Sequence, residues 1–106
     1  MYIDIEASRA FWRRSAERLA DRSWRDASAL ALSSSTQQFC TRAAIRVVDK
    51  ALEVMGGGAF FKRAPLERIY RDVRAGQFHP ISHYDALEYI GKAELGIPQV
   101  QQPRFR

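Results

Sequence analysis

Two histidines, His79 and His83, are the residues whose type and spacing most directly suggest chemistry. Histidines four positions apart on one helix face can bind a metal ion. Pro80 follows His79 directly and disfavours a helical backbone at the residue before it, so we expect His79 in a loop ahead of the helix that carries His83. No cysteine or carboxylate stands at a spacing that would complete a ligand set, and we predict no metal site. His79 remains a candidate catalytic residue, as a general base or a donor at a pocket wall, with an exposed loop histidine as the alternative.

Cys40 and a run of three glycines could also take part in chemistry. Cys40 lies on the apolar side of a predicted helix without a sign of a partner base, and we interpret it as a buried small hydrophobic residue. Gly56, Gly57 and Gly58 could bring backbone N–H groups close to a phosphate. They match neither a phosphate-binding loop nor a dinucleotide fingerprint, so the spacing by itself indicates a helix C-cap and a turn.

Arginines dominate the charge of the chain. There are 17 Lys and Arg residues against 12 Asp and Glu, and the net charge is +5. The basic residues are spread along the whole chain, most of them within a helical turn or two of an acid, which favours a salt-bridged surface over a nucleic-acid footprint. A cluster of Arg68, Arg71 and Arg74 is interpreted in the same way, with an arginine directed at a pyrophosphate as the alternative. A small basic helical module that binds nucleic acid or an acidic protein partner remains an alternative function.

Helical periodicity covers nearly the whole chain, so helices must position these residues. Strong helix breakers before the tail occur only at residues 56–58 and 76–80. The pattern predicts four helices, over residues 3–22, 26–55, 65–75 and 83–95. The predicted fold class is all-α: an antiparallel helical bundle of two long and two shorter helices. Residues 1–96 form its single domain, and residues 97–106 form a flexible basic tail.

Local signals mark the ends of these helices. Asp26 and Ser82 are predicted N-caps, and Asp85, three residues after Ser82, completes a pattern that resembles a capping box. Gly56 and Gly96 are predicted to end the second and the last helix.

The first two helices carry more apolar surface than a small domain can bury. The first helix has one apolar stripe through Ile3 and Phe11 and a second through Ile5, Trp12 and Leu19. A helix at the edge of a small monomer needs only one such stripe. Because apolar patches of this size are seldom left in contact with water, we expect a homo-oligomer, a dimer or tetramer with C2 symmetry favoured.

Composition also indicates a compartment. No apolar run approaches the ~20 residues of a membrane span, and the N-terminal stretch lacks the apolar region of a secretory signal. Cys40 is the single cysteine, which excludes an internal disulfide. We therefore expect a cytoplasmic protein with no membrane partner.

The segment over residues 51–76 resembles the C-terminal helical domain of the acyl-CoA dehydrogenase family. Its sequence is ALEVMGGGAFFKRAPLERIYRDVRAG. The positions that match the family pattern are Gly56, Gly57, Phe60, Pro65, Glu67, Arg68, Arg71, Asp72 and Arg74. Residues 5–9 resemble the signature of the preceding helix, and the likeness extends over residues 3–96. A histidine after the Arg-Asp segment is typical of the type-2 variant shared with flavin-dependent monooxygenases.

The resemblance implies a flavin site that this chain builds only in part. In such proteins FAD lies between a β-domain and this helical bundle, and the loop that matches Glu53, Gly56 and Gly57 touches the FAD of a neighbouring subunit. Pro80 stands at about the place of the dehydrogenase base, and His79 matches the histidine of the monooxygenase-like relatives. The chain resembles a truncated relative. We expect an oligomerisation unit that needs a complementary flavin-binding chain to form an FAD- and acyl-CoA-type oxidoreductase site, with no cofactor and no activity alone.

Overall fold

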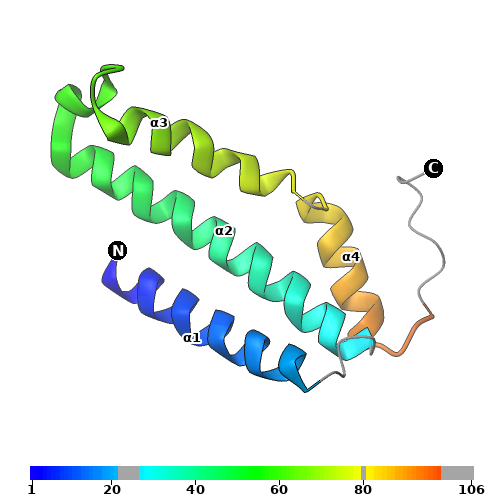
Figure 1. The fold of residues 1–106 in the computed structure, drawn as a ribbon. Coiled ribbons are helices and arrows are strands. Elements are labelled where there is room, and N and C mark those ends of the chain that lie inside the picture. The colour runs from blue at the N-terminus through cyan, green and yellow to red at the C-terminus, as the bar shows by residue number, and fades with distance from the viewer. Residues whose placement is uncertain (22–26, 80, 99–106) are drawn as a thin grey trace.

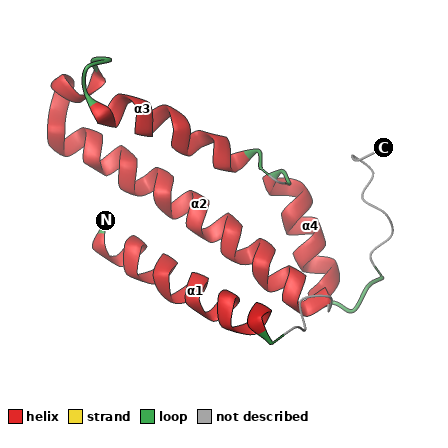
Figure 2. Cartoon of the chain, in the orientation of Figure 1, coloured by secondary structure: helices red, strands yellow, loops and turns green. Residues whose placement is uncertain are grey.

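The fold, seen in a computed structural model that describes residues 1–21, 27–79 and 81–98, consists of helices joined by short turns. The elements are α1 (Tyr2–Ala20), α2 (Ala27–Met55), the 3-10 helix η1 (Gly56–Phe60), α3 (Pro65–Asp72), the 3-10 helix η2 (Val73–Gln77) and α4 (His83–Glu94) (Figure 1). The described residues contain no strand (Figure 2). The all-α prediction, with two long and two shorter helices, is confirmed. The predicted N-cap at Asp26 and the tail over 99–106 lie outside the described residues.

Helix α2 is the centre of the arrangement. Helix α1 packs antiparallel along one side of it, and α3, η2 and α4 follow one another along the other side (Figure 1). Helix α1 makes no substantial contact with α3 or α4. Every other helix is therefore positioned by its packing against α2.

The side of α1 that faces α2 combines Phe11, from the first predicted apolar stripe, with polar residues. Asp4 pairs with Arg46, the rings of Phe11 and Phe39 pack with centroids 5.7 Å apart, and Ser15 is buried. Asp4, Phe11 and Ser15 follow one another at helical spacing. Phe11 of the first stripe therefore meets α2, whereas Ile3 of the same stripe and Trp12 of the second stay largely exposed. That an oligomer covers these exposed side chains stays a prediction.

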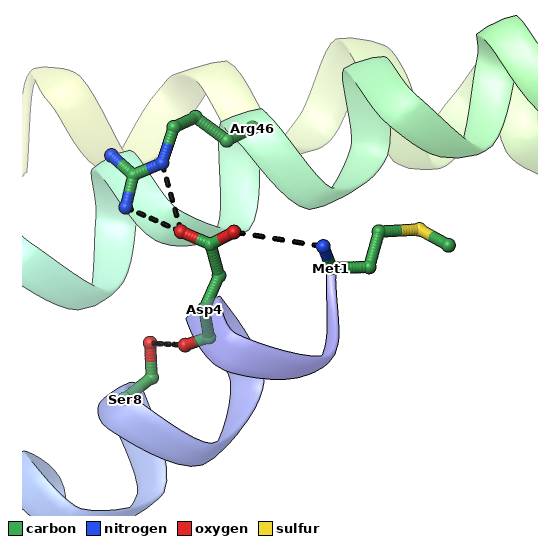
Figure 3. A network of polar contacts seen from close by, with 4 residues as sticks. All are labelled: Met1, Asp4, Ser8 and Arg46. Atoms are coloured by element: carbon green, nitrogen blue, oxygen red, sulfur yellow. Dashed lines mark hydrogen bonds and ion pairs between the residues drawn. The ribbon is translucent and has the colours of Figure 1, made fainter.

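A polar network fixes the N-terminal end of α1 (Figure 3). The guanidinium of Arg46 donates from Nε and Nη2 to Oδ1 of Asp4, over 2.9 and 2.6 Å, and the terminal amine of Met1 lies 3.7 Å from Oδ2. Ser8 donates to the carbonyl of Asp4 over 2.7 Å. The hydrogen bonds and charge of Arg46 hold the pKa of Asp4 below its usual value.

Small side chains form the buried part of the fold. The buried apolar residues are Ala29, Ala31, Ala43, Val48, Ala59 and Ala86. No large side chain among the described residues is fully buried, whereas several large apolar ones are exposed: Ile3, Trp12, Val54, Phe60, Phe78, Tyr84 and Leu95. Small residues let helices approach closely, but they bury little apolar area.

The predicted helix ends are found where the sequence signals placed them. Gly56 ends α2 at φ +68°, and Gly96 follows α4 at φ +66°, a left-handed conformation that favours glycine. Ser82 caps α4 by accepting a hydrogen bond from the backbone N–H of Asp85. The helix predicted over 65–75 starts at Pro65 as expected, but its last turn tightens into η2 after Asp72.

Candidate functional site

The turn ahead of α4 carries the candidate catalytic histidine. His79 is exposed and precedes α4, whereas His83 is the first residue of that helix. The prediction that Pro80 separates the two histidines into a loop and a helix is confirmed. Within the described ranges no three His, Cys, Asp or Glu side chains gather closely enough to hold a metal ion.

A chain of hydrogen bonds connects α2 to this turn. Gln37 donates from Nε2 to the carbonyl of Gly76 over 3.3 Å and to the carbonyl of His79. Gln38 donates from Nε2 to Oε1 of Gln37 over 2.8 Å, and its own Oε1 lies 2.8 Å from Nδ1 of His83. Nε2 of His83 contacts the guanidinium of Arg42. The three residues of α2 in this group, Gln37, Gln38 and Arg42, lie near the middle of that helix.

The direction of each bond in this chain follows from chemistry. Oε1 of Gln38 can only accept, so Nδ1 of His83 carries the proton and donates it. Nε2 of His83 then accepts from Arg42, which can only donate. The arrangement therefore assigns His83 the Nδ1–H tautomer. Sequence reasoning missed this group, because Gln38 and His83 are 45 positions apart and share no motif.

A shallow pocket of about 230 Å³ opens beside the same residues. Its walls include Arg42, Phe78, His83 and Tyr84, which supply one cationic, one imidazole and two aromatic groups. Phe78 and Tyr84 are largely exposed. The pocket offers hydrogen-bond donors and ring faces to a polar ligand.

The glycine run follows the C-terminal end of α2, away from the Gln37 group. A Cβ built on Gly56, Gly57 or Gly58 meets no other atom within 4 Å, so this backbone is open to an approaching group. Glu53, one turn earlier, is exposed and pairs with Lys50 over 2.6 Å. The bond to Glu53 raises the pKa of Lys50 above its ordinary value.

The structure does not bring the two sets of predicted site residues together. Gln37, which contacts the His79 backbone, stands 18 residues before Met55, the last residue of α2. At 1.5 Å per residue this separation is about 27 Å along the helix axis. Glu53, Gly56 and Gly57 therefore form one candidate site and His79 another.

The arginine cluster of α3 and η2 is mainly engaged within the chain. Arg74 pairs with Asp49 over 2.9 Å, donates to the carbonyl of Tyr70 and stacks on its ring. Arg71 lies 3.6 Å from Glu67. These contacts agree with the interpretation of both arginines as members of ion pairs. Arg74 also joins η2 to α2, because Asp49 belongs to α2.

Cys40 is half-buried, so the prediction that it is buried was too strong. Its thiol lies 3.7 Å from the carbonyl of Ser8, at the contact between α1 and α2. An open groove of about 450 Å³ beside it exposes part of this contact, with Trp12 and Leu19 at its rim. No helix in the described part of the chain combines the length and apolar character needed to cross a bilayer.

Comparison with known proteins identifies the class to which this helical fold belongs. A sequence model of the family described as "Acyl-CoA dehydrogenase, C-terminal domain" matches residues 1–84. The chain belongs to this family, and the resemblance expected from residues 3–96 is confirmed. No solved structure matches the chain.

Individual relatives carry two kinds of activity in their names. The chain is 43% identical over 56 residues to an amino sugar nitrososynthase of Streptomyces peucetius, a match covering 52% of this chain and 14% of the relative. It is 48% identical over 52 residues to an L-evernosamine nitrososynthase of a Micromonospora species, covering 48% of this chain and 12% of the relative. It is 33% identical over 95 residues to a cyclohex-1-ene-1-carbonyl-CoA dehydrogenase of Geobacter metallireducens, covering 90% of this chain and 24% of the relative. The matched region thus spans a quarter or less of each of these three relatives.

Proposed function

We propose that the chain is a self-associating helical unit of the acyl-CoA dehydrogenase type that supplies part of a flavin site to a complementary chain. The observation that carries the first half is the absence of any fully buried large side chain among the described residues. Ile3 and Trp12, which are 81% and 65% exposed, stand on opposite sides of the α1–α2 contact. Burying such side chains stabilises an assembly by about 1.5–3 kcal/mol each. A dimer or tetramer covers these surfaces.

Residues at the glycine end fit one wall of an FAD site. Gly57 lies outside the left-handed region and has open space where a side chain would stand, so none of the described residues requires glycine there. Close approach of a ligand from a neighbouring subunit would explain why glycine stands at position 57. Backbone N–H groups of Gly56 and Gly57 would bind the anionic part of FAD, and Lys50 offsets the negative charge of Glu53 beside them.

His79 is the proposed catalytic residue. FAD, when bound, supplies the electron-accepting or oxygen-activating group of the reaction. The imidazole of His79 holds or releases a proton at a ring nitrogen, and its exposure on the chain leaves it accessible to the flavin-binding partner. Residues 1–96 form the working domain, with 97–106 as a tail, and the protein acts in the cytoplasm.

Sedimentation at micromolar concentration tests the assembly. We expect a dimer or tetramer that Trp12→Ser and Ile3→Ser each weaken. Arg13→Ser, an exposed and charged neighbour on α1, serves as the matched control and leaves the assembly unchanged. A folded monomer across the whole concentration range refutes self-association.

Complementation tests the flavin site. The full chain is mixed with an acyl-CoA dehydrogenase from which the matching C-terminal domain has been removed, and bound FAD is measured by its visible absorbance. We expect Gly57→Ala to weaken FAD retention without lowering the stability of the chain, and Gly58→Ala, the variable position of the family pattern, to have no effect. Equal retention by all three proteins overturns the assignment of Gly57. Tight DNA binding with a steep salt dependence would instead favour the nucleic-acid alternative.

A further inference from the structure

We propose that Gln37 is a positioning residue that holds the backbone of the 76–79 turn against α2 and thereby sets the place of the His79 imidazole. The inference deepens the proposed function and rests on it, because His79 is the residue that Gln37 would position. Gln37 bonds the backbone carbonyl of His79, and the described part of the chain shows no hydrogen bond to the His79 imidazole. Its position must therefore come from the backbone that carries it.

The Gln37 amide contacts both ends of this turn. Its Nε2 group has two hydrogens, and they go to the carbonyls of Gly76 and His79. Gly76 lies in η2 and His79 lies beyond it, and the Phe78 N–H bonds the carbonyl of Ala75. A single side chain of α2 thus adds two hydrogen bonds that join the end of η2 and the residue after Phe78 to α2.

Neighbouring groups fix which way the Gln37 amide faces. Gln38, which is 8% exposed, donates to Oε1 of Gln37 and so directs the NH2 group of Gln37 toward the turn. His83 holds Gln38 in turn through the bond from Nδ1, and Arg42 donates to the other ring nitrogen. Each side chain in this hydrogen-bond series donates to the next one. The series therefore runs in a single direction, from the guanidinium of Arg42 to the carbonyls of the turn.

A second, independent contact shows that the turn packs closely against α2. A Cβ at Gly76 would lie 2.8 Å from Cγ2 of Thr41, one helical turn beyond Gln37. Only glycine allows this approach without movement. The carbonyl of Gly76 can therefore reach Gln37. Helix α2 thus both donates hydrogen bonds to the turn, through Gln37, and packs directly against it, through Thr41.

Amide hydrogen exchange on the full chain tests whether the Gln37 hydrogen bonds hold the turn, a role called the tether below. Gln37→Met keeps the size of the side chain and removes both donors. We expect the Phe78 amide, which bonds Ala75 within the turn, to exchange about 5- to 30-fold faster. The Leu95 amide, bonded to Gly91 at the far end of α4, provides the internal reference and keeps its rate. Gln77→Met, the same change at an exposed amide of the turn, is the matched control.

A second variant separates positioning from general loosening. Gln38→Glu keeps an acceptor for Nδ1 of His83 but removes the N–H that orients Gln37. We expect faster exchange at Phe78 while the ring-nitrogen shifts of His83 still report the Nδ1–H tautomer. An unchanged Phe78 rate in both variants, or an equal rise in Gln77→Met, overturns the inference. Loss of the Nδ1–H signature in Gln38→Glu also counts against it.

Turnover of the complemented enzyme distinguishes this inference from the proposed function. If Gln37→Met frees the turn and lowers kcat with little change in KM, both stand. If the turn is freed and His79→Ala leaves kcat unchanged, the tether stands and the catalytic role of His79 falls. If the turn is freed and kcat falls in His79→Ala but not in Gln37→Met, the positioning role is overturned while the proposed function survives.

Discussion

Replacing Gly76 by alanine tests how closely the 76–79 turn packs against α2. The added Cβ would lie 2.8 Å from Cγ2 of Thr41, closer than real Cβ contacts allow, and 3.1 Å from Oγ1, which is unusually tight. Threonine cannot easily move away, because its branched Cβ permits few side-chain rotations in a helix. Gly76 is not among the residues with positive φ, so the backbone itself accepts alanine and the effect is steric.

The magnitude comes from two opposing effects. Overpacking of this kind costs about 1–3 kcal/mol of unfolding free energy. Alanine also restricts the unfolded chain, which stabilises the fold by roughly 0.4–1 kcal/mol. We expect a net loss of about 1–2 kcal/mol for Gly76→Ala on these grounds. In a Thr41→Ala background the clash is absent, and the same substitution should stabilise the chain by about 0.4–1 kcal/mol.

A double-mutant cycle makes this reversal measurable. Urea unfolding of the parent, both single variants and the double variant is followed by far-UV circular dichroism at one fixed protein concentration, since assembly shifts apparent stability. The coupling between the two positions should be about 1–3 kcal/mol, because the effect on the unfolded chain cancels in the cycle. Additivity to within about 0.5 kcal/mol would refute the close contact.

Three further predictions concern the helix ends and the α1–α2 ion pair. Ser82→Ala should cost about 0.5–2 kcal/mol in urea unfolding, because the Asp85 N–H loses its cap; equal stability would contradict the cap geometry. Gly96→Ala should cost about 1–2 kcal/mol in the same assay, because alanine is strained at φ +66°; a stabilised variant would show that the left-handed residue is not needed. Asp4→Asn should lower Tm at neutral pH, because Arg46 lowers the pKa of Asp4 in the folded state and the resulting stability is present above the unfolded pKa. This difference should fade as pH falls through the folded pKa, and a Tm difference that persists at acid pH would argue against the ion pair.

Local signals in the sequence were sufficient for the four helices and for the ends that Pro65, Gly56, Ser82 and Gly96 mark. Pro65, Gly56 and Gly96 act through their own backbone conformations, which no distant residue needs to supply. The step from His79 in a loop to His83 in a helix was also predictable, because Pro80 restricts its immediate predecessor. The family resemblance likewise rested on residues close together in the chain.

The contacts of the candidate site were not predictable in this way. The chain from Arg42 through His83 and Gln38 to Gln37 joins positions more than 40 residues apart, and glutamine carries no signal of which carbonyl it will bind. The tightening of the helix into η2 after Asp72 also had no clear mark in the sequence.

Apolar periodicity could not say which residues of α1 meet α2, for a physical reason. Hydrophobic stripes report where apolar surface lies on a helix, but not which neighbour covers it. Asp4, Phe11 and Ser15 meet α2, so one residue of the first stripe joins polar groups at the contact, while Ile3 and Trp12 remain largely exposed. The sequence by itself determined the helices, their ends and the family, since these depend on local conformation and local motifs. Only the tertiary structure decided which α1 face meets α2 and how Gln37 reaches the turn of His79, because both depend on distances between residues remote in the chain.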